Sequence, residues 1–565
     1  MVDTTVPAVV AALAGARPDA LAVIDGPRRL RWRHLADQSR RFADALHRRG
    51  FGAHGDPAGV EPWRSTQDHV GLCLHNGAEF LVAMLGAFGA RVAPFNINYR
   101  YVADELRYVL TDAAAGALVF HSGYAEAVAE AARAVGSVRL LAQVRDGSGA
   151  PLVPGAVWFD DLLAGADPAG PPVVSSPDDR YILYTGGTTG RPKGVLWRQA
   201  DALVACFGVP RDATSLAEVT AAATAPIRLL PTPPFIHGAG QWVALRTLIG
   251  GGTVVVPEQP DRFDPAAVWR AVEHERVTSL AVVGDSFCVP LLAELDRRHY
   301  DASSLTVLLS GGAPLSARVV EALLQRLPTV LVVDGLGSSE VGGQVVRVAS
   351  NGTPPGSFEA NLVTTVLSDD LTRPLAPGEA EVGWLASAGR LALGYLDDPI
   401  ATARTFPTVA GVRHGVPGDR ASRRADGTIV VHGRDARTIN TGGEKVFAEE
   451  VEEALRAHPA VDDCVVTAGP SERWGQEIVA LVQFRPGRRP ASAEVLAAAE
   501  ARLARFKLPK RIVVVPAVRR SPAGKADLAW ARAVAGAADA GVTDAAGGSG
   551  ERGERVEVEG VLEMP

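Results

Sequence analysis

Short apolar runs alternate along the chain with segments that have the spacing of amphipathic helices. Residues 21–25 and 30–32 flank the turn sequence GPRR and predict a hairpin, and the helix predicted after it places Leu35, Phe42 and Leu46 on one stripe. Further strands are predicted near residues 70, 91, 117, 180, 279, 306 and 329. Strands separated by helices are typical of mainly parallel sheets with both faces covered, so the pattern predicts an α/β fold.

The pattern changes near residue 433 to a compact series of elements. Helices and strands are predicted there at residues 447–458, 461–468, 477–484, 493–506 and 510–516. We therefore divide the chain into a large domain over residues 1–433 and a small α+β domain over residues 434–537, which has a normal domain size. Residues 538–565 are rich in Gly, Ala, Asp and Glu and predict a disordered tail.

Other segments are predicted to be irregular or only locally ordered. Residues 54–67 and 146–179 contain Pro and Gly among polar residues, which is typical of surface loops. The apolar segment 6–16 predicts a short helix with Pro7 in its first turn. A signal peptide is not favoured, because Asp3 stands where a signal peptide carries Lys or Arg.

Composition narrows the class of protein. Among 565 residues, 47% are hydrophobic and 21% are charged, and no apolar stretch approaches the roughly 18 residues that a membrane span needs. A net charge of -7 without a basic block argues against nucleic acid as the main partner. The four cysteines form no CxxC pair and favour neither a zinc site nor disulfides. We expect a soluble protein of the reducing cytoplasm.

Lysine is rare in this chain. Only five of the 57 basic residues are lysines: Lys193, Lys445, Lys507, Lys510 and Lys525. Because arginine serves almost everywhere else, a retained lysine can mark a position that needs a compact, flexible charge, although codon bias explains any single lysine equally well. Lys193 and Lys525 stand out through the sequences around them.

Lys193 lies in a glycine- and threonine-rich segment, TGGTTGRPKG, that directly follows a predicted strand. Glycines let the backbone curl with its N–H groups pointing inward, and the threonine hydroxyls and Lys193 add donors, which suits a polyphosphate. The segment is not a Walker A loop, because Gly194 follows the lysine where Ser or Thr is required. The predicted phosphate-binding residues are Thr185, Gly186, Gly187, Thr188, Thr189, Gly190 and Lys193.

This segment resembles the phosphate-binding loop of the adenylate-forming superfamily, which includes acyl-CoA synthetases, aryl-CoA ligases, luciferases and peptide-synthetase adenylation domains. Further matches follow in order from about residue 20 to residue 533. The resemblance implies a large domain of layered mixed sheets and a small, mobile C-terminal domain. It also implies that SGGAPL and DGLGSSE form the ATP pocket, with the predicted contacts Gly311, Gly312, Ala313, Asp334, Gly335, Leu336, Gly337, Ser338 and Ser339.

The same resemblance assigns charged residues around ATP. Glu340 corresponds to the carboxylate that helps to hold Mg2+, a hard cation that prefers oxygen ligands. Asp419, in GDRA, corresponds to the aspartate that binds the ribose hydroxyls, and Arg434 to the arginine near the ribose at the domain junction. Without the resemblance, the simpler interpretation of each of these three residues would be a charge exposed to solvent.

Lys525, in SPAGKADL, corresponds to the catalytic lysine of adenylation. It would bridge the carboxylate and the α-phosphate while pyrophosphate leaves. His237 corresponds to the residue that gates the acyl pocket, although a structural buried histidine is nearly as good an interpretation. Gly442 and Gly443 match the turn beside which the pantetheine of CoA passes. Ala436 departs from the family pattern, because many relatives carry Asp or Lys there as the hinge.

The leading interpretation is therefore a ligase that uses ATP and Mg2+ to adenylate a small carboxylate and then transfers the acyl group to CoA. An alternative keeps the first step and changes the second, as in a diazotase that activates nitrite for attack by an aryl amine, or a protein that loads a carrier. A regulatory nucleotide-binding protein is disfavoured because both Lys193 and Lys525 are present. The sequence alone predicts neither the acid nor the oligomeric state.

Overall fold

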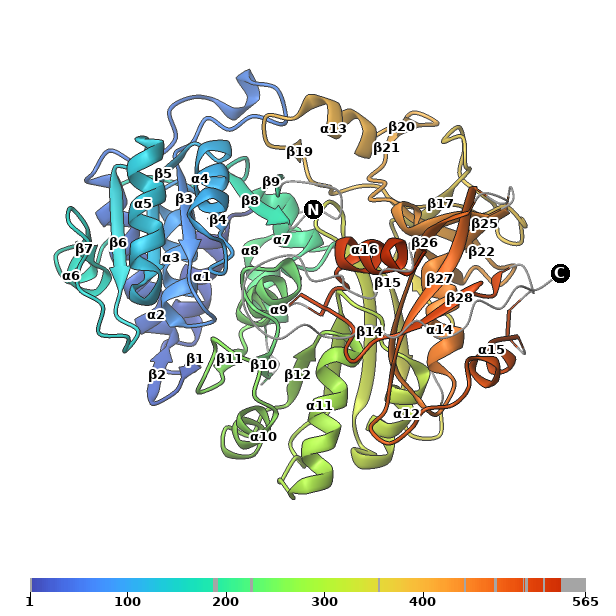
Figure 1. Ribbon diagram of the computed structural model, residues 1–565. Coiled ribbons are helices and arrows are strands. Elements are labelled where there is room, and N and C mark those ends of the chain that lie inside the picture. The colour runs from blue at the N-terminus through green and yellow to red at the C-terminus, as the bar shows by residue number, and fades with distance from the viewer. Residues whose placement is uncertain are drawn as a thin grey trace.

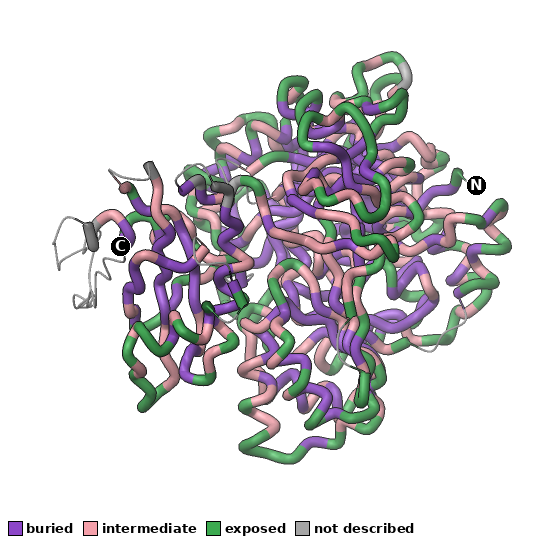
Figure 2. The backbone as a smooth tube through the Cα atoms, turned by 90° about the vertical axis from the view of Figure 1, so that its right-hand side faces the viewer, coloured by how far each residue is buried: buried purple, intermediate pink, exposed green. Residues whose placement is uncertain are grey.

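The structure is a computed structural model that describes residues 3–185, 192–223, 227–353, 356–441, 444–471, 475–500, 502–503, 507–521 and 524–539. Its elements form layered sheets with helices between and around them, and the elements that follow β23 gather at one side of the molecule (Figure 1). The burial pattern follows this arrangement, since buried segments run through the interior and exposed segments form the outer loops (Figure 2).

The first large sheet is mixed, with the strand order β16-β15-β14-β13-β12-β10-β11-β1-β2. Its central strands are parallel, and β2, β15 and β16 pair antiparallel at its two edges. The bounds are β1 Leu21–Asp25, β2 Arg28–Arg31, β10 Arg228–Pro231, β11 Thr253–Val256, β12 Ser279–Val282, β13 Val307–Gly311, β14 Leu331–Ser338, β15 Gly342–Ala349 and β16 Glu359–Ala360. One face of it is covered by α10 Pro265–His274, α11 Gly284–Arg297 and α12 Ala317–Arg326.

The second large sheet is also mixed, with the order β19-β9-β8-β4-β3-β5-β6-β7. Its bounds are β3 His69–Cys73, β4 Ala93–Asn96, β5 Ala115–His121, β6 Leu140–Val144, β7 Val157–Trp158, β8 Arg180–Thr185, β9 Lys193–Arg198 and β19 Gly394–Tyr395. The helices α4 Ala103–Asp112 and α5 Ala125–Val135 cover one face. The main core lies on the other face and includes the fully buried Trp32, Phe42, Phe80 and Phe88.

That core is built largely from helices between the two large sheets. They are α1 Val6–Ala16, α2 Trp32–His47, α3 Ala78–Gly89, α6 Phe159–Ala164, α7 Gln199–Ala205, α8 Leu216–Ala222 and α9 Gly238–Ile249. A four-stranded antiparallel sheet follows, formed by β17 Thr364–Leu367, β18 Gly383–Ser387, β22 Asp419–Arg423 and β23 Ile429–Arg434. Near it lie α13 Pro399–Thr405 and the hairpin of β20 Thr408–Val409 and β21 Val412–Arg413.

The C-terminal part has its own sheet and its own cores. The strands are β24 Thr438–Thr441, β25 Glu444–Phe447, β26 Val461–Ser471, β27 Gly475–Phe484 and β28 Arg511–Val514. The helices α14 Ala448–Arg456 and α15 Ser492–Glu500 pack on one face, and α16 Leu528–Asp539 packs on the other. The boundary predicted at residue 433 falls at the end of β23, directly before the short helix Asp435–Arg437.

Most elements predicted from the sequence are confirmed, and some are missed. The hairpin, the first helices and the strands of both large sheets occur where expected. The segment 146–179, predicted to be irregular, contains β7 and α6. α16 was not predicted, and it runs two residues into the predicted tail, at residues 538–539; residues 540–565 lie outside the described residues. The α/β class with layered mixed sheets and a separate C-terminal sheet is confirmed.

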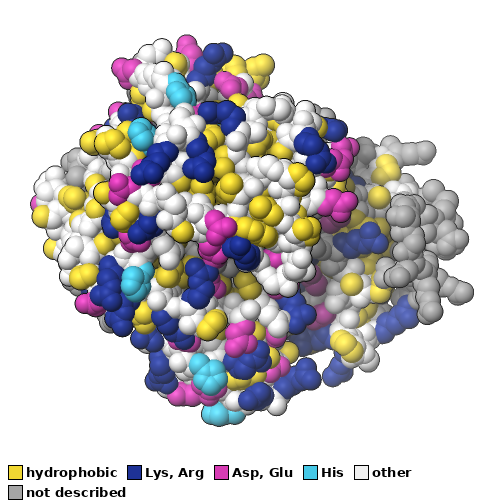
Figure 3. Space-filling view, turned by 90° about the vertical axis from the view of Figure 1, so that its left-hand side faces the viewer, with side chains coloured by type: hydrophobic (Ala, Val, Ile, Leu, Met, Phe, Trp, Pro, Cys, Tyr) yellow, Lys and Arg dark blue, Asp and Glu magenta, His cyan; other side chains and the backbone are white. Residues whose placement is uncertain are grey.

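The surface and the cysteines add little that is specialised. All four cysteines are buried and free. Within the described residues, no helix combines the length and apolar character that a membrane crossing needs. The face shown in Figure 3 carries Lys and Arg side chains interspersed with Asp and Glu.

Candidate active site

The turn after β13 lies against the beginning of α11. Ser310 and Gly311 of β13 pair with Asp334 and Gly335 of β14. At Gly284 the backbone has a φ of +51°, and a Cβ atom would lie 2.9 Å from the carbonyl oxygen of Ala313, so glycine is required there. This close approach brings the predicted nucleotide contacts Gly311, Gly312 and Ala313 beside the start of α11.

The remaining predicted nucleotide contacts lie on β14 or directly after it. Asp334 is buried, and its carboxylate accepts a hydrogen bond of 2.8 Å from Arg347 Nε on β15. Burial raises the pKa of Asp334, and the charge of Arg347 opposes that shift. Asp334 therefore already joins β14 to β15, and its contact with ATP stays a prediction. The same stretch contains Gly335, Leu336, Gly337, Ser338 and Ser339, whose carbonyl oxygen accepts from Trp197 Nε1 over 2.9 Å.

Glu340 is held by a tyrosine that the sequence analysis did not select. Tyr395 donates its hydroxyl hydrogen to Glu340 Oε1 over 2.8 Å. Lys193 Nζ lies 5.4 Å from the centre of the Tyr395 ring and 2.8 Å from Asp398 Oδ2. Burial, together with the charge of Glu340, raises the pKa of Tyr395, so its hydroxyl stays protonated at neutral pH. These four residues are called the Glu340 cluster below. They place two carboxylates, a phenol and an ammonium group next to one another.

Strand pairing explains why the Glu340 cluster forms. Lys193 begins β9, and β9 pairs with β19, which ends at Tyr395. Asp398 caps α13, where its side chain accepts from Ala401 N, and Pro399 follows it in the first turn. The sequence Asp-Pro signals that cap. The ion pair of Asp398 with Lys193, which lies 205 residues earlier in the chain, cannot be predicted from the local sequence.

The predicted phosphate loop is described only at its ends. Thr185 ends β8 and lies opposite Lys193, the first residue of β9. Gly186, Gly187, Thr188, Thr189 and Gly190 lie outside the described residues. The hairpin of β8 and β9 therefore fixes the two residues that enter and leave this segment.

Two buried asparagines tie the predicted acyl side to the phosphate side. Asn96 exchanges hydrogen bonds with the backbone of Tyr184, at 2.9 Å and 2.8 Å, and donates to Ile236 O over 2.6 Å. Asn76 holds the backbone of Pro231, Pro233 and Phe235 in the same way. The segment that precedes His237 is thus fixed relative to the end of β8.

His237 stands at the N-cap position of α9, but its side chain makes no capping hydrogen bond. Burial lowers the pKa of His237 to about 4, with smaller contributions from the charges of Lys525 and Arg100. The imidazole is therefore neutral at neutral pH. It lies within reach of the charge of Lys525, although the two residues are far apart in the sequence.

Asp419 and Arg434 face each other across the pair of β22 and β23. Arg434 Nε lies 3.3 Å from Asp419 Oδ1. Asp419 is only 4% exposed, and burial raises its pKa, against the effect of the Arg434 charge and with that of Glu340. The predicted ribose residues thus lie together and within electrostatic reach of Glu340.

The loop that carries Lys525 lies against α11. Burial of its ammonium group lowers the pKa of Lys525, the charge of Arg434 adds to this shift, and the charge of Glu340 opposes it. Part of the side chain nevertheless remains open to solvent. The preceding Gly524 has a φ of +74°, and a Cβ atom there would collide with Ser286 Oγ of α11. Lys525 thus lies within electrostatic reach of Glu340, Arg434 and His237.

The predicted CoA contacts are not described. Gly442 and Gly443 lie outside the described residues, between the paired residues Thr441 and Glu444 of β24 and β25. At the start of α11, Asp285 accepts a hydrogen bond of 2.8 Å from Ser316 N, and Ser286 Oγ donates to Val283 O over 2.9 Å.

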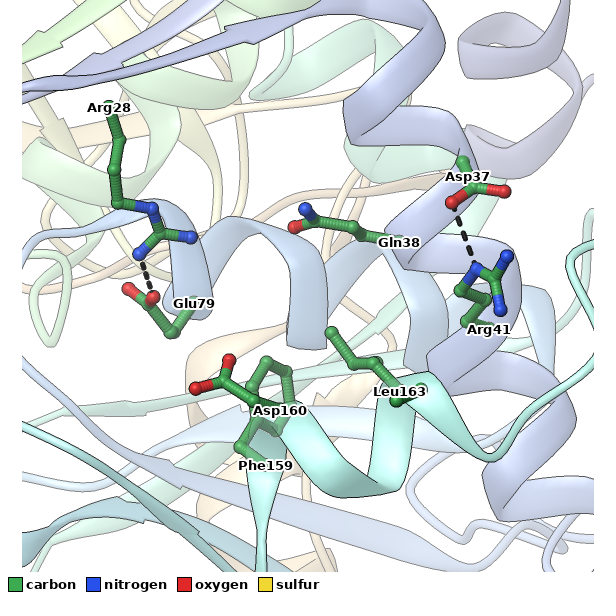
Figure 4. Close-up of a pocket in the computed structure, with 9 residues that line it drawn as sticks. Arg28, Asp37, Gln38, Arg41, Glu79, Phe159, Asp160 and Leu163 are labelled. Atoms are coloured by element: carbon green, nitrogen blue, oxygen red, sulfur yellow. Dashed lines mark hydrogen bonds and ion pairs between the residues drawn. The ribbon is translucent and has the colours of Figure 1, made fainter.

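A separate cavity of about 250 Å³ opens between α2, α3 and α6 (Figure 4). Its arginines are paired with carboxylates, Arg28 with Glu79 and Arg41 with Asp37. The residues that line it come from β2 and these three helices, not from the segments around Lys525 and Glu340. We therefore locate the candidate active site at the meeting of β14, β19, β23, α11 and the Lys525 loop.

Comparisons with known proteins identify the family of this chain. The family model for AMP-binding enzymes matches residues 10–396, and that for the AMP-binding enzyme C-terminal domain matches residues 450–525. The chain is 47% identical over 536 residues to the medium-chain acyl-CoA ligase Mig of Mycobacterium avium, covering 94% of this chain and 98% of that protein.

Two further comparisons support this result. A medium/long-chain-fatty-acid–CoA/3-oxocholest-4-en-26-oate–CoA ligase of Mycobacterium tuberculosis is 38% identical, with 91% of this chain and 93% of that protein covered. The crystal structure of ATP-bound MatB from Rhodopseudomonas palustris superposes with a TM-score of 0.78 at 23% identity, covering 94% of this chain and 99% of that one, and shows that the fold is shared. The chain therefore belongs to the AMP-binding enzyme family.

Proposed function

We propose that this protein is an ATP-dependent acyl-CoA ligase that works through an acyl-adenylate. The observation that carries this proposal is the packing of the Lys525 loop on α11, which brings Lys525 within electrostatic reach of Glu340, Arg434 and His237. Two cations and a carboxylate within reach of one another's charges suit a reaction in which negative charge shifts between a carboxylate and a triphosphate.

In the first step, a carboxylate oxygen of the substrate attacks the α-phosphorus of ATP, and the bond to pyrophosphate breaks. Lys525 stabilises the charge that develops between the carboxylate and the α-phosphate. Asp419 and Arg434 bind the ribose, and Lys193 holds the phosphates once ATP competes with Asp398 for its ammonium group. Adenylation gives the poor electrophile a good leaving group.

Mg2+ fits the donor set around Glu340. One oxygen of this carboxylate accepts from Tyr395, so the other oxygen can face a hard cation. The described residues contain no group of three or more His, Cys, Asp or Glu side chains that could hold a metal by itself. Mg2+ would therefore arrive with ATP, and Glu340 would help to hold it and supply a negative charge to it.

In the second step, the CoA thiolate attacks the acyl carbon, and the carbon–oxygen bond to AMP breaks. Gly442 and Gly443 are proposed to lie beside pantetheine. CoA is favoured over nitrite and aryl amine chemistry because the relatives named above are CoA ligases. We place the reaction in the cytoplasm, because the four free, buried cysteines fit a reducing compartment.

An acid with an extended apolar tail is the proposed substrate. The names of the relatives point to medium-chain, long-chain and steroid-derived acids. On the acyl side, a Cβ atom at Gly312 would face Val283 Cγ1 at 3.8 Å and Ala239 Cβ at 4.0 Å, so small apolar groups surround this point. Neutral His237 adds no charge to this side.

The proposal is tested with purified protein, ATP, Mg2+ and straight-chain acids from hexanoate to palmitate, together with a steroid side-chain acid. Each acid is incubated with and without CoA, and nitrite with an aryl amine serves as the competing pair. Mass spectrometry is expected to find acyl-AMP without CoA and acyl-CoA with it. Formation of an amine-derived product, with no thioester from any acid, would contradict the proposal.

A further inference from the structure

A chain of paired charges runs through the C-terminal part, from Arg437 at the end of the short helix Asp435–Arg437 to the Lys525 loop. Its members are Arg437, Glu449, Glu452, Arg456, Asp463 and Arg520. Each of these side chains is at most 25% exposed, and Glu452 is only 4% exposed. Paired charges with so little exposure are held in defined positions. Separating such a pair would leave a buried charge without a partner and would raise the free energy of the folded state.

The contacts follow one another without a gap. Arg437 binds Glu449 over 2.8 Å and also binds Glu452. Arg456 lies 3.3 Å from Glu452 and 3.5 Å from Asp463. Glu452 is fixed further because its Oε1 accepts from Val466 N over 2.9 Å. The chain of charges thereby joins α14 to β26.

Arg520 connects the end of this chain to the Lys525 loop. Its Nε and Nη2 atoms donate to the two oxygens of Asp463 over 2.6 Å and 2.8 Å, which is the geometry of a strong bidentate pair. Its remaining Nη1 donates to the carbonyl oxygen of Gly524 over 3.0 Å. That carbonyl belongs to the peptide bond that enters Lys525, so the guanidinium sets the orientation of this peptide.

The loop itself is tight and has little room to shift. Ser521 N donates to Lys525 O over 2.7 Å, and Gly524 N donates to Ser521 O over 2.8 Å. On its other side, Gly524 packs so closely on Ser286 of α11 that a Cβ atom would collide with Ser286 Oγ. A small displacement of the Gly524 peptide would therefore move the Lys525 ammonium away from the reacting atoms.

We propose that Arg520, held by Asp463, is a positioning residue for Lys525, and that the chain of buried charges holds Asp463 and Arg520 in place. This proposal rests on the proposed adenylation function.

The proposal predicts that the two half-reactions separate. Adenylation needs Lys525 at the α-phosphate, whereas thioester formation starts from an adenylate from which pyrophosphate has already left. Loss of the positioning contact should therefore lower the first rate and spare the second. A general loss of folding would lower both.

The variants are Arg520→Gln and Asp463→Asn, with Arg520→Lys as the conservative replacement. The matched control is Arg519→Gln, which removes an exposed arginine next to Arg520 that stacks on Trp530. Adenylation is measured as acid-dependent pyrophosphate release, with kcat and KM determined for ATP and acid. Thioester formation is measured from synthetic acyl-AMP and CoA, and unfolding is followed in urea.

For Arg520→Gln and Asp463→Asn we expect kcat of adenylation to fall about 10-fold to 100-fold with little change in KM, because misplacement by about 1 Å has this effect. Thioester formation should stay within about twofold, and Arg520→Lys should recover part of the loss. Equal losses in both half-reactions, or no loss in either, would overturn the positioning role. A wild-type protein that forms neither pyrophosphate nor thioester would instead refute the proposed function.

Discussion

At the scale of single residues, Lys525 carries the most specific expectation. Lys525→Ala should fold normally, because the side chain belongs to no core, yet lose about 100-fold to 1000-fold of its acid-dependent pyrophosphate release. Lys507→Ala is the matched control, because Lys507 is a lysine of the same part of the chain that pairs with Glu450. Pyrophosphate release at the wild-type rate by folded Lys525→Ala would show that Lys525 is a surface charge without a role in adenylation.

His237 gives an expectation for pH. Its pKa is lowered from 6.5 to about 4 in the folded protein, so the unfolded chain takes up the proton first as the pH falls. Its contribution to stability is therefore present above pH 6.5 and is lost as the pH falls toward 4. Between pH 7 and pH 5 this loss amounts to about 2 kcal/mol.

The measurement is urea unfolding of the wild type and of His237→Asn at both pH values, with the exposed His299→Asn as control. The variant at residue 237 should lose less stability on acidification than the wild type, and the variant at residue 299 should behave as the wild type does. An identical pH dependence in all three proteins would show that His237 titrates normally.

The residues that could be predicted are those with a local sequence signal. Lys525, Glu340, Asp419 and Arg434 sit in short motifs, and the structure brings them within reach of one another's charges. Their catalytic roles stay predictions. Tyr395 was not predicted as a site residue, because only its hydrogen bond to Glu340, 55 residues earlier in the chain, indicates a role for it.

At the scale of elements, hydrophobic spacing located the parts that bury large side chains. The helix with Leu35, Phe42 and Leu46 and the strands of the parallel sheets have such spacing. α16 was missed because it buries mainly small residues, Ala531, Val534 and Ala535, on β26 and β27. α6 was missed because it is one short segment in a region rich in Pro and Gly.

The contact between the Lys525 loop and α11 leads to an element-scale expectation. Gly524→Ala should lower adenylation about 10-fold or more, because the new methyl group collides with Ser286 Oγ and the backbone is in the left-handed region. Ser286→Ala removes that oxygen and leaves the Ser286 Cβ at 3.4 Å from the new group. The double variant should therefore regain part of the lost rate.

Both variants are compared in the pyrophosphate assay, and thioester formation from synthetic acyl-AMP reports on folding. A double variant no better than Gly524→Ala would show that the strained backbone, not the contact with α11, limits the reaction. Unchanged adenylation in Gly524→Ala would mean that the loop does not pack on α11 during this step.

At the scale of the whole molecule, the arrangement joins two parts that each lack a complete site. Glu340, Lys193, Asp419 and His237 lie in elements that precede the short helix at Asp435, whereas Lys525 lies beyond β28. The buried charges from Arg437 to Arg520 give the second part a rigid frame for that lysine. The sequence predicted that the chain has two parts, but it did not predict the buried ion pairs of the second part. Ion pairs between distant elements produce no periodic pattern in the sequence.

The central claim is that a substrate carboxylate attacks the α-phosphorus of ATP, and an oxygen label tests it most directly. The protein is incubated with octanoate labelled with oxygen-18 in its carboxyl group, ATP, Mg2+ and CoA, and the products are analysed by mass spectrometry. An acyl-adenylate pathway leaves one labelled oxygen in AMP and none in pyrophosphate, because the thiolate breaks the bond between the acyl carbon and that oxygen. Release of ADP with the label in inorganic phosphate, or AMP without label, would contradict the account.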